Sequence, residues 1–243
     1  MNQTQNYTGA VESSFSTATT RKFLLNVYNW MAMGLAITGV IAYGISKSSF
    51  VETLYTNSFL LIGIVILQLA VVMGLTFAIN KIPAGVAIGG FFLYSALTGI
   101  TMSAIFLVYT GTSIASTFFI CAGMFGAVSA FGYLTKMDLS KFGTFFFMAL
   151  IGLIIASVVN IFLKSTMMNY IISYAGVIIF VGLTAYDTQK IKRMSQSTDV
   201  DTEQGKKSAV FGSLMLYLDF INMFMFLMRI FGDRKKQLEL DNW

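Results

Sequence analysis

The chain has 243 residues, of which 56% are hydrophobic and 11% are charged, and its formal net charge is +5. Soluble domains carry about 25% charged residues. This composition, with a mean hydropathy of +0.73, therefore excludes a soluble globular protein and predicts an integral membrane protein. One cysteine and no histidine exclude an internal disulfide, a zinc hydrolase motif, a His-ligated haem and a Ser-His-Asp triad.

Residues 1–20 are polar and lack the apolar core of a cleavable signal peptide, so we expect a mobile cytoplasmic tail there. Apolar segments long enough to cross a bilayer as helices follow. They are Trp30–Ile45, Ser58–Ile79, Ala84–Tyr109, Ser113–Leu134, Phe142–Leu163, Tyr170–Ile191 and Ala209–Phe231. We predict an all-α membrane protein, with a seven-transmembrane-helix bundle over residues 21–232 and a charged C-terminal tail over residues 233–243.

The basic residues between these segments are distributed asymmetrically. With the N-terminus inside, most of them fall in inside loops, and the outside loops hold only Lys47 and Lys164. The positive-inside rule therefore predicts a cytoplasmic N-terminus, and it accounts for the basic balance without a nucleic-acid partner. The basic residues after Phe231 oppose this rule, so segment 209–231 is either a full span or re-entrant. Its middle has no glycine or proline, which favours a full span.

Two aspartates, Asp187 and Asp219, are the only acidic residues inside long apolar segments. A charged side chain in hydrocarbon costs roughly 3 kcal/mol on insertion scales, so such residues mark functional sites. Helical spacing places Asp219, Asn222 and Arg229 on one stripe of the seventh segment, and Asp187 and Lys190 on one face of the sixth. Depths of about 9 and 14 Å below the interface bring the two carboxylates within reach of each other.

A close carboxylate pair shares a proton near neutrality. Once that proton leaves, the two carboxylates and the Asn222 carbonyl form a hard-oxygen site that binds a divalent cation such as calcium weakly. We therefore predict that Asp187 and Asp219 sense pH and line an ion pathway, with transient calcium and no resident cofactor. The alternative is structural: each aspartate is neutral, or pairs with Lys190 or Arg229, and ties helices together.

Three motifs resemble those of the Bax inhibitor-1 family, also called the transmembrane Bax-inhibitor-motif family. They are AYDTQKIKR around Asp187, LYLDFINMFMFLMRIFG around Asp219 and SALTGIT at Ser95–Thr101. The resemblance extends from Arg21 to Gly232. It implies a seven-helix bundle with the last helix central and wrapped by the other six. It also implies a pH-sensitive calcium leak with the aspartate pair as its cytosolic sensor, and Arg229 matches a basic position associated with that site.

The sequence departs from the family pattern in the second segment. Members of the family can carry a glutamate within this helix and an arginine near its end that latches the aspartate pair. Here Gln68 stands at the position of the acid, and Lys81 is the nearest basic residue to the latch position. A lysine lacks the bidentate grip of arginine, so we expect gating and ion selectivity to differ.

Two other functions fit parts of the sequence. Tyr186 directly before Asp187 resembles the Tyr-Asp of intramembrane aspartyl proteases, whose proton-sharing pair hydrolyses peptides. Against this, Leu216–Asp219 is not Gly-x-Gly-Asp, and no proline follows Pro83. The other function, implied by the family, is a stress or cell-death regulator that acts through partners such as a membrane protease, without transport. We expect an integral protein of a bacterial inner membrane, and no enzyme.

Overall fold

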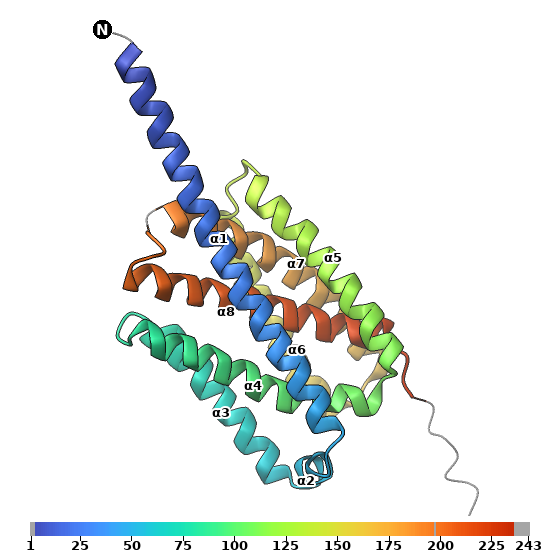
Figure 1. Cartoon of the computed structure of the whole chain (residues 1–243). Coiled ribbons are helices and arrows are strands. Elements are labelled where there is room, and N and C mark those ends of the chain that lie inside the picture. The colour runs from blue at the N-terminus through green and yellow to red at the C-terminus, as the bar shows by residue number, and fades with distance from the viewer. Residues whose placement is uncertain (1–2, 197, 236–243) are drawn as a thin grey trace, which may run out of the picture.

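The computed structural model describes residues 3–196 and 198–235, with side chains from Thr19 onward. The described part is helical (Figure 1). Its elements are α1 (Gln3–Ser46), α2 (Phe50–Thr56), α3 (Ser58–Ala78), α4 (Ala84–Val108), α5 (Gly111–Leu134), α6 (Ser140–Leu163), α7 (Thr166–Gln196) and α8 (Glu203–Phe231). Seven of these are long and apolar enough to cross a membrane, α1 through its part Thr19–Ser46. The predicted all-α, seven-helix membrane protein is confirmed.

Several helices extend beyond their predicted segments at polar ends. Helix α7 continues to Gln196, beyond the predicted end at Ile191, and α8 begins at Glu203, before the predicted start at Ala209. A backbone that stays helical past the hydrocarbon keeps its hydrogen bonds. The start of α8 is also capped by the Thr202 hydroxyl, which accepts a hydrogen bond from the Gly205 N–H. Short α2, which buries Val51 and Leu54, was not predicted.

Helix α8 is the central helix of the bundle. Of its most apolar 18-residue stretch, 61% is buried, against 44% for α4, which ranks next. It packs against α1, α4, α5 and α7, as the crossing ribbons in Figure 1 show. The expected central position of the last helix is confirmed. The remaining two long helices lie further out, because α3 packs mainly on α4, and α6 packs on α7.

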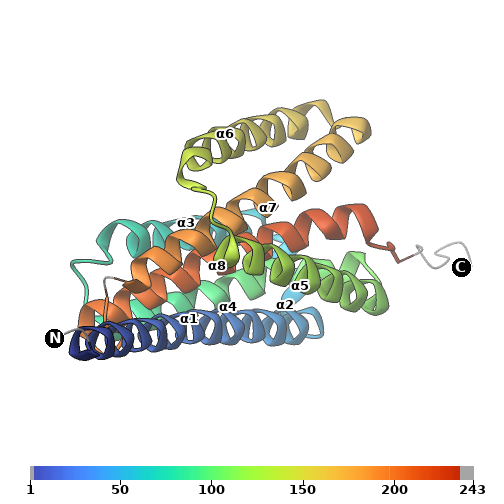
Figure 2. The same cartoon turned by 90° about the horizontal axis from the view of Figure 1, so that it is seen from above.

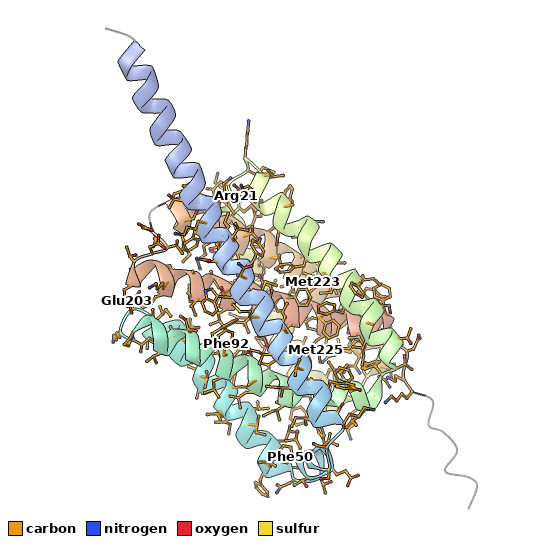
Figure 3. All side chains as sticks on the ribbon, viewed as in Figure 1. Arg21, Phe50, Phe92, Glu203, Met223 and Met225 are labelled. Atoms are coloured by element: carbon orange, nitrogen blue, oxygen red, sulfur yellow. The ribbon has the colours of Figure 1, made fainter. Side chains whose placement is uncertain are left out.

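The loops separate into two ends of the bundle. At the end that we call the basic end (residues 19–22, 79–84, 135–140 and 198–204), Lys22 pairs with Asp201 at 2.6 Å and Arg193 pairs with Asp138 at 3.2 Å. Here the Ala84 N–H also donates to the Glu203 carboxylate at 2.5 Å. Figure 3 labels Glu203 at this end of α8 and Phe50 at the opposite end of the molecule.

The chain after α8 is fixed at the opposite end. The Thr110 N–H donates to the Asp233 carbonyl at 3.0 Å, and the Lys235 N–H donates to the Val108 carbonyl at 2.9 Å. The Lys235 ammonium donates to the Phe106 carbonyl at 2.7 Å. Since α8 is one continuous helix with its two ends held at opposite ends of the bundle, it crosses the whole bundle and does not turn back.

Helix α6 and the first half of α7 diverge from the other helices, as the view from above shows (Figure 2). Only 11% of the most apolar stretch of α6 is buried. Its packing partner is α7, and no comparable packing joins it to α3 or α8 among the described residues. The side of α8 that faces α6 is therefore incompletely covered by protein.

Candidate functional site

Asp219 lies in the middle of α8 and is almost fully buried, with 4% of its surface exposed. Its Oδ2 atom is buried and has no hydrogen-bond partner among the described residues. A buried carboxylate oxygen without a partner is costly, so it calls for an explanation such as a bound proton, water molecule or ion. The unpartnered oxygen therefore marks Asp219 as a position for a proton or for a ligand.

Asp187 belongs to α7, and its carboxylate is near enough to Asp219 to act on it electrostatically. The two helices pack directly against each other, and both aspartates line one cavity of about 830 Å³. This places together the two residues that the sequence singled out. Asp187 is half-buried and so is the more accessible of the two.

The cavity has a polar part and an apolar part. Thr76 of α3, Thr144 of α6, and Tyr186 and Lys190 of α7 lie toward the basic end with Asp187. The rest of the lining is mostly apolar and comes from the middle and later turns of α6, from Phe180 and Leu183 of α7, and from residues of α8 such as Leu218 and Phe226. The volume lies in the range of small-molecule sites, which are mostly apolar with a few converging polar groups.

Asn222 lines the same cavity one turn beyond Asp219. Its side-chain N–H donates to the Leu218 carbonyl at 2.8 Å, within its own helix. The amide nitrogen is thereby held by the helix, and the amide oxygen is the atom that can accept a proton donor or a cation. Two carboxylates and one amide oxygen are thus available in one place.

The cationic side chains expected near the pair do not form ion pairs with it. Among the described residues, no Lys or Arg nitrogen lies within 4.0 Å of either aspartate. Lys190 lines the cavity and influences Asp187 electrostatically, with its ammonium 5.8 Å from the centre of the Phe211 ring. Arg229 is exposed near the far end of α8, over the Phe226 ring at 5.4 Å. No ion pair therefore supports the alternative in which Lys190 or Arg229 pairs with an aspartate to tie the helices together.

Tyr186 positions α6 against α7. A Cβ atom added at Gly143 would meet Tyr186 Cε2 and Cζ at 2.7 Å. With glycine at this crossing, the aromatic ring lies against the α6 backbone and also lines the cavity. Tyr186 is therefore a wall of the site.

Gln68 and Lys81, the residues at which the sequence departs from the family pattern, do not line the cavity. Lys81 is exposed in the turn between α3 and α4. Gln68 faces α4, where its side-chain N–H donates to the Thr98 hydroxyl at 3.0 Å. In this conformation Gln68 supports helix packing, and it adds no polar group to the pair.

A second polar cluster lies on the other side of α8 and escaped the sequence analysis. The Tyr217 hydroxyl is fully buried and lies 2.6 Å from the Thr38 hydroxyl of α1. Thr38 also donates to the Ser95 carbonyl of α4 at 2.9 Å. Tyr217 and Asp219 are two residues apart, which on a helix is roughly 200° of rotation, so they point to opposite sides. The SALTGIT motif was the only signal for this cluster.

A resident metal centre is not indicated by the donor set. No group of three or more Asp, Glu, Cys or His side chains gathers within residues 3–196 and 198–235. Calcium takes six to eight oxygens, and the two aspartates and Asn222 supply at most about five, so water would have to complete the shell.

Comparison with known proteins agrees with this architecture. The sequence profile of the family described as "Inhibitor of apoptosis-promoting Bax1" matches residues 20–236. The chain is 53% identical over 215 residues to the inner membrane protein YbhL of Escherichia coli K12, covering 88% of this chain and 92% of the relative. It is 38% identical over 215 residues to a membrane protein of Streptococcus pyogenes serotype M1, covering 87% and 92% of the two chains.

Proposed function

We propose, on the premise that this chain belongs to the Bax inhibitor-1 family of membrane proteins, that it is a pH-sensitive calcium leak of a bacterial inner membrane. Its basic end faces the cytoplasm, in agreement with the positive-inside rule. The observation that carries the proposal is the buried, unpartnered Oδ2 of Asp219, on the wall of the cavity that Asp187 shares.

The proposed sensor is the aspartate pair. Two carboxylates that interact in a low-dielectric cavity share a proton, and loss of that proton adds one negative charge to the cavity. The other charged or titratable groups on the cavity wall are Lys190 and Tyr186 of α7, and α3 and α6 contribute none. With Lys190 positive, the cavity wall is neutral while the pair holds one proton and carries one negative charge once that proton is lost, so cations enter more readily at higher pH.

The proposed path begins at the basic end of the cavity and passes the pair. Weak binding by two carboxylates and the Asn222 oxygen lets a calcium ion leave again, as conduction requires. Beyond the pair and Asn222 the cavity wall is mostly apolar, with Ser157 of α6 as a polar exception. Passage to the other side of the membrane therefore requires α6 and α7 to move. Of the helices around the cavity, only α3 is less buried than α6.

The test is calcium influx into vesicles that hold the purified protein and a calcium indicator, recorded from about pH 6 to pH 8. We expect influx to rise with pH in the wild type. In Asp187→Asn and Asp219→Asn we expect the ratio of influx at high and low pH to fall to about one, because the shared proton is gone.

The matched control is Asp138→Asn. This variant makes the same chemical change at an exposed loop residue of the basic end, outside the cavity, and it should keep the wild-type pH profile. Wild-type influx no greater than that of empty vesicles would refute the leak. The regulator that acts through membrane-protein partners would then be the better hypothesis.

A further inference from the structure

The cavity at the aspartate pair is open to the side, toward lipid. Four of its α6 side chains are substantially exposed although they line it: Phe147 at 59%, Ile154 at 55%, Val158 at 49% and Ile161 at 67%. Helix α6 has no extensive packing with α3 or α8 within the described residues, and Figure 2 shows it standing apart from them. In a bilayer, the space beside these residues is filled by acyl chains.

The polar end of this opening carries charges of both signs. Asp219 and Asp187 supply carboxylates, and Lys190, one turn after Asp187, supplies an ammonium. Neither aspartate has a cationic partner within 4.0 Å among the described residues, and Lys190 has no acidic one. The two parts of the opening are arranged along the membrane normal: the charged side chains lie toward the basic end, and the apolar wall lies deeper in the membrane.

We propose that the cavity binds a zwitterionic aminophospholipid from the leaflet at the basic end. One acyl chain lies along Ile154 and Val158 of α6. The primary ammonium donates to Asp219 and Asp187, and the phosphate accepts from Lys190. This headgroup supplies a donor for the unpartnered Oδ2 of Asp219 and an anion for the unpaired lysine in one molecule.

The headgroup chemistry separates this lipid from its neighbours. A choline headgroup has no N–H and cannot donate to the Asp219 oxygen, and a glycerol headgroup carries no cation. Selectivity for the primary amine is therefore the signature of a built site, whereas ordinary boundary lipid is not expected to discriminate by headgroup.

Lipid binding does not require any ion to move, so this inference goes beyond the calcium leak. Only its consequence for flux rests on the proposed function. An ammonium that occupies the aspartate pair excludes a calcium ion from it, so calcium influx should fall as the fraction of aminophospholipid rises.

The experiment uses the full-length protein in vesicles that contain phosphatidylethanolamine with a photoactivatable diazirine in one acyl chain. After irradiation, mass spectrometry measures labelling of α6 peptides. We expect unlabelled phosphatidylethanolamine to compete, and phosphatidylcholine or phosphatidylglycerol to compete about tenfold less well. Asp219→Asn and Lys190→Gln should each reduce labelling about tenfold for the same reason.

A second pair of variants leaves the charges untouched. Ile154→Trp fills the cavity wall, whereas Ile155→Trp adds the same bulk at a neighbouring residue of α6 that is 58% exposed and outside the cavity. We expect labelling to be lost in the first and kept in the second. Equal competition by all three lipids, equal labelling of the two tryptophan variants, or no label on α6 would each overturn the inference.

Calcium influx recorded in the same vesicles separates the two proposals. Amine-selective labelling without influx would retain the lipid site and refute the leak. Influx without amine-selective labelling would support the leak and refute the lipid site.

Discussion

Helices α1 and α4 approach each other closely at Gly99, and Gly99→Ala tests whether this contact is rigid. A Cβ atom at this position would lie 2.8 Å from the Thr38 carbonyl oxygen and 2.9 Å from Ile41 Cβ. Real Cβ contacts essentially never fall below 3.0 Å. Both obstacles belong to or adjoin the α1 backbone, so no side-chain rotation relieves them, and the two helices must separate.

The cost follows from overpacking. A displacement of a few tenths of an ångström in a packed interior typically costs about 1–3 kcal/mol. For a chain of this length each kcal/mol lowers Tm by roughly 2–4 °C, so we expect a fall of roughly 2–12 °C. The separation also strains the bond between Thr38 and Tyr217, which places the effect at the upper part of that range.

The chain carries its own probe for this measurement. Cys121 is the only cysteine and is fully buried, so a thiol-reactive dye reports unfolding in detergent as the temperature rises. The control is Gly89→Ala on the same helix, where an added Cβ meets nothing within 4 Å. If Gly99→Ala melts within about 1 °C of this control, the contact between α1 and α4 is not rigid and the reasoning fails.

Three further predictions concern other parts of the fold. Tyr217→Phe removes the buried hydroxyl bonded to Thr38 and should cost about 1 kcal/mol, seen as a Tm lower by roughly 2–4 °C; an unchanged Tm would contradict it. Lys164 has a left-handed backbone with φ of 51°, which costs a non-glycine residue about 1–2 kcal/mol, so Lys164→Gly should raise Tm by roughly 2–8 °C, while Lys164→Ala should not. Hydrogen bonding from the Ser140 backbone, then its hydroxyl, and from Arg193 lowers the pKa of Asp138. The ionised Asp138 carboxylate therefore stabilises the fold above pH about 4, and this stabilisation is lost as the pH falls through the lowered pKa. Tm of the wild type should therefore decline at acid pH, and in Asp138→Asn this part of the decline should be absent.

The elements that the sequence predicted well are those with a local signal. A run of apolar residues specifies a membrane helix by itself, so Ser58–Ile79 and Ser113–Leu134 agree with α3 and α5 within two residues. Asp187 and Asp219 could be identified from the local sequence alone, because each is an acidic residue within an apolar segment. Their shared cavity followed from antiparallel neighbouring helices and depth.

The rest depends on contacts between distant residues, which leave no periodic signal. Tyr217 reads as one more core aromatic, and only the fold brings Thr38 to its hydroxyl. Gln68 looked like a missing acid of the ion path, yet its rotamer joins it to Thr98. Arg229 shares the stripe of Asp219, but ten residues of helix, roughly 15 Å, separate them along the axis.

The central position of α8 has a consequence for how the protein is made. This helix leaves the ribosome after α1, α4, α5 and α7, the helices that it packs against. Until it arrives, the Thr38 hydroxyl of α1 and the polar groups of α4 beside it lack Tyr217 and have only lipid or each other as neighbours. Domains that form from the N-terminus onward bury each new element on finished ones. Here α1 and α4 can pack on each other before α8 arrives, but the side of the bundle that α8 fills stays open until translation is nearly complete.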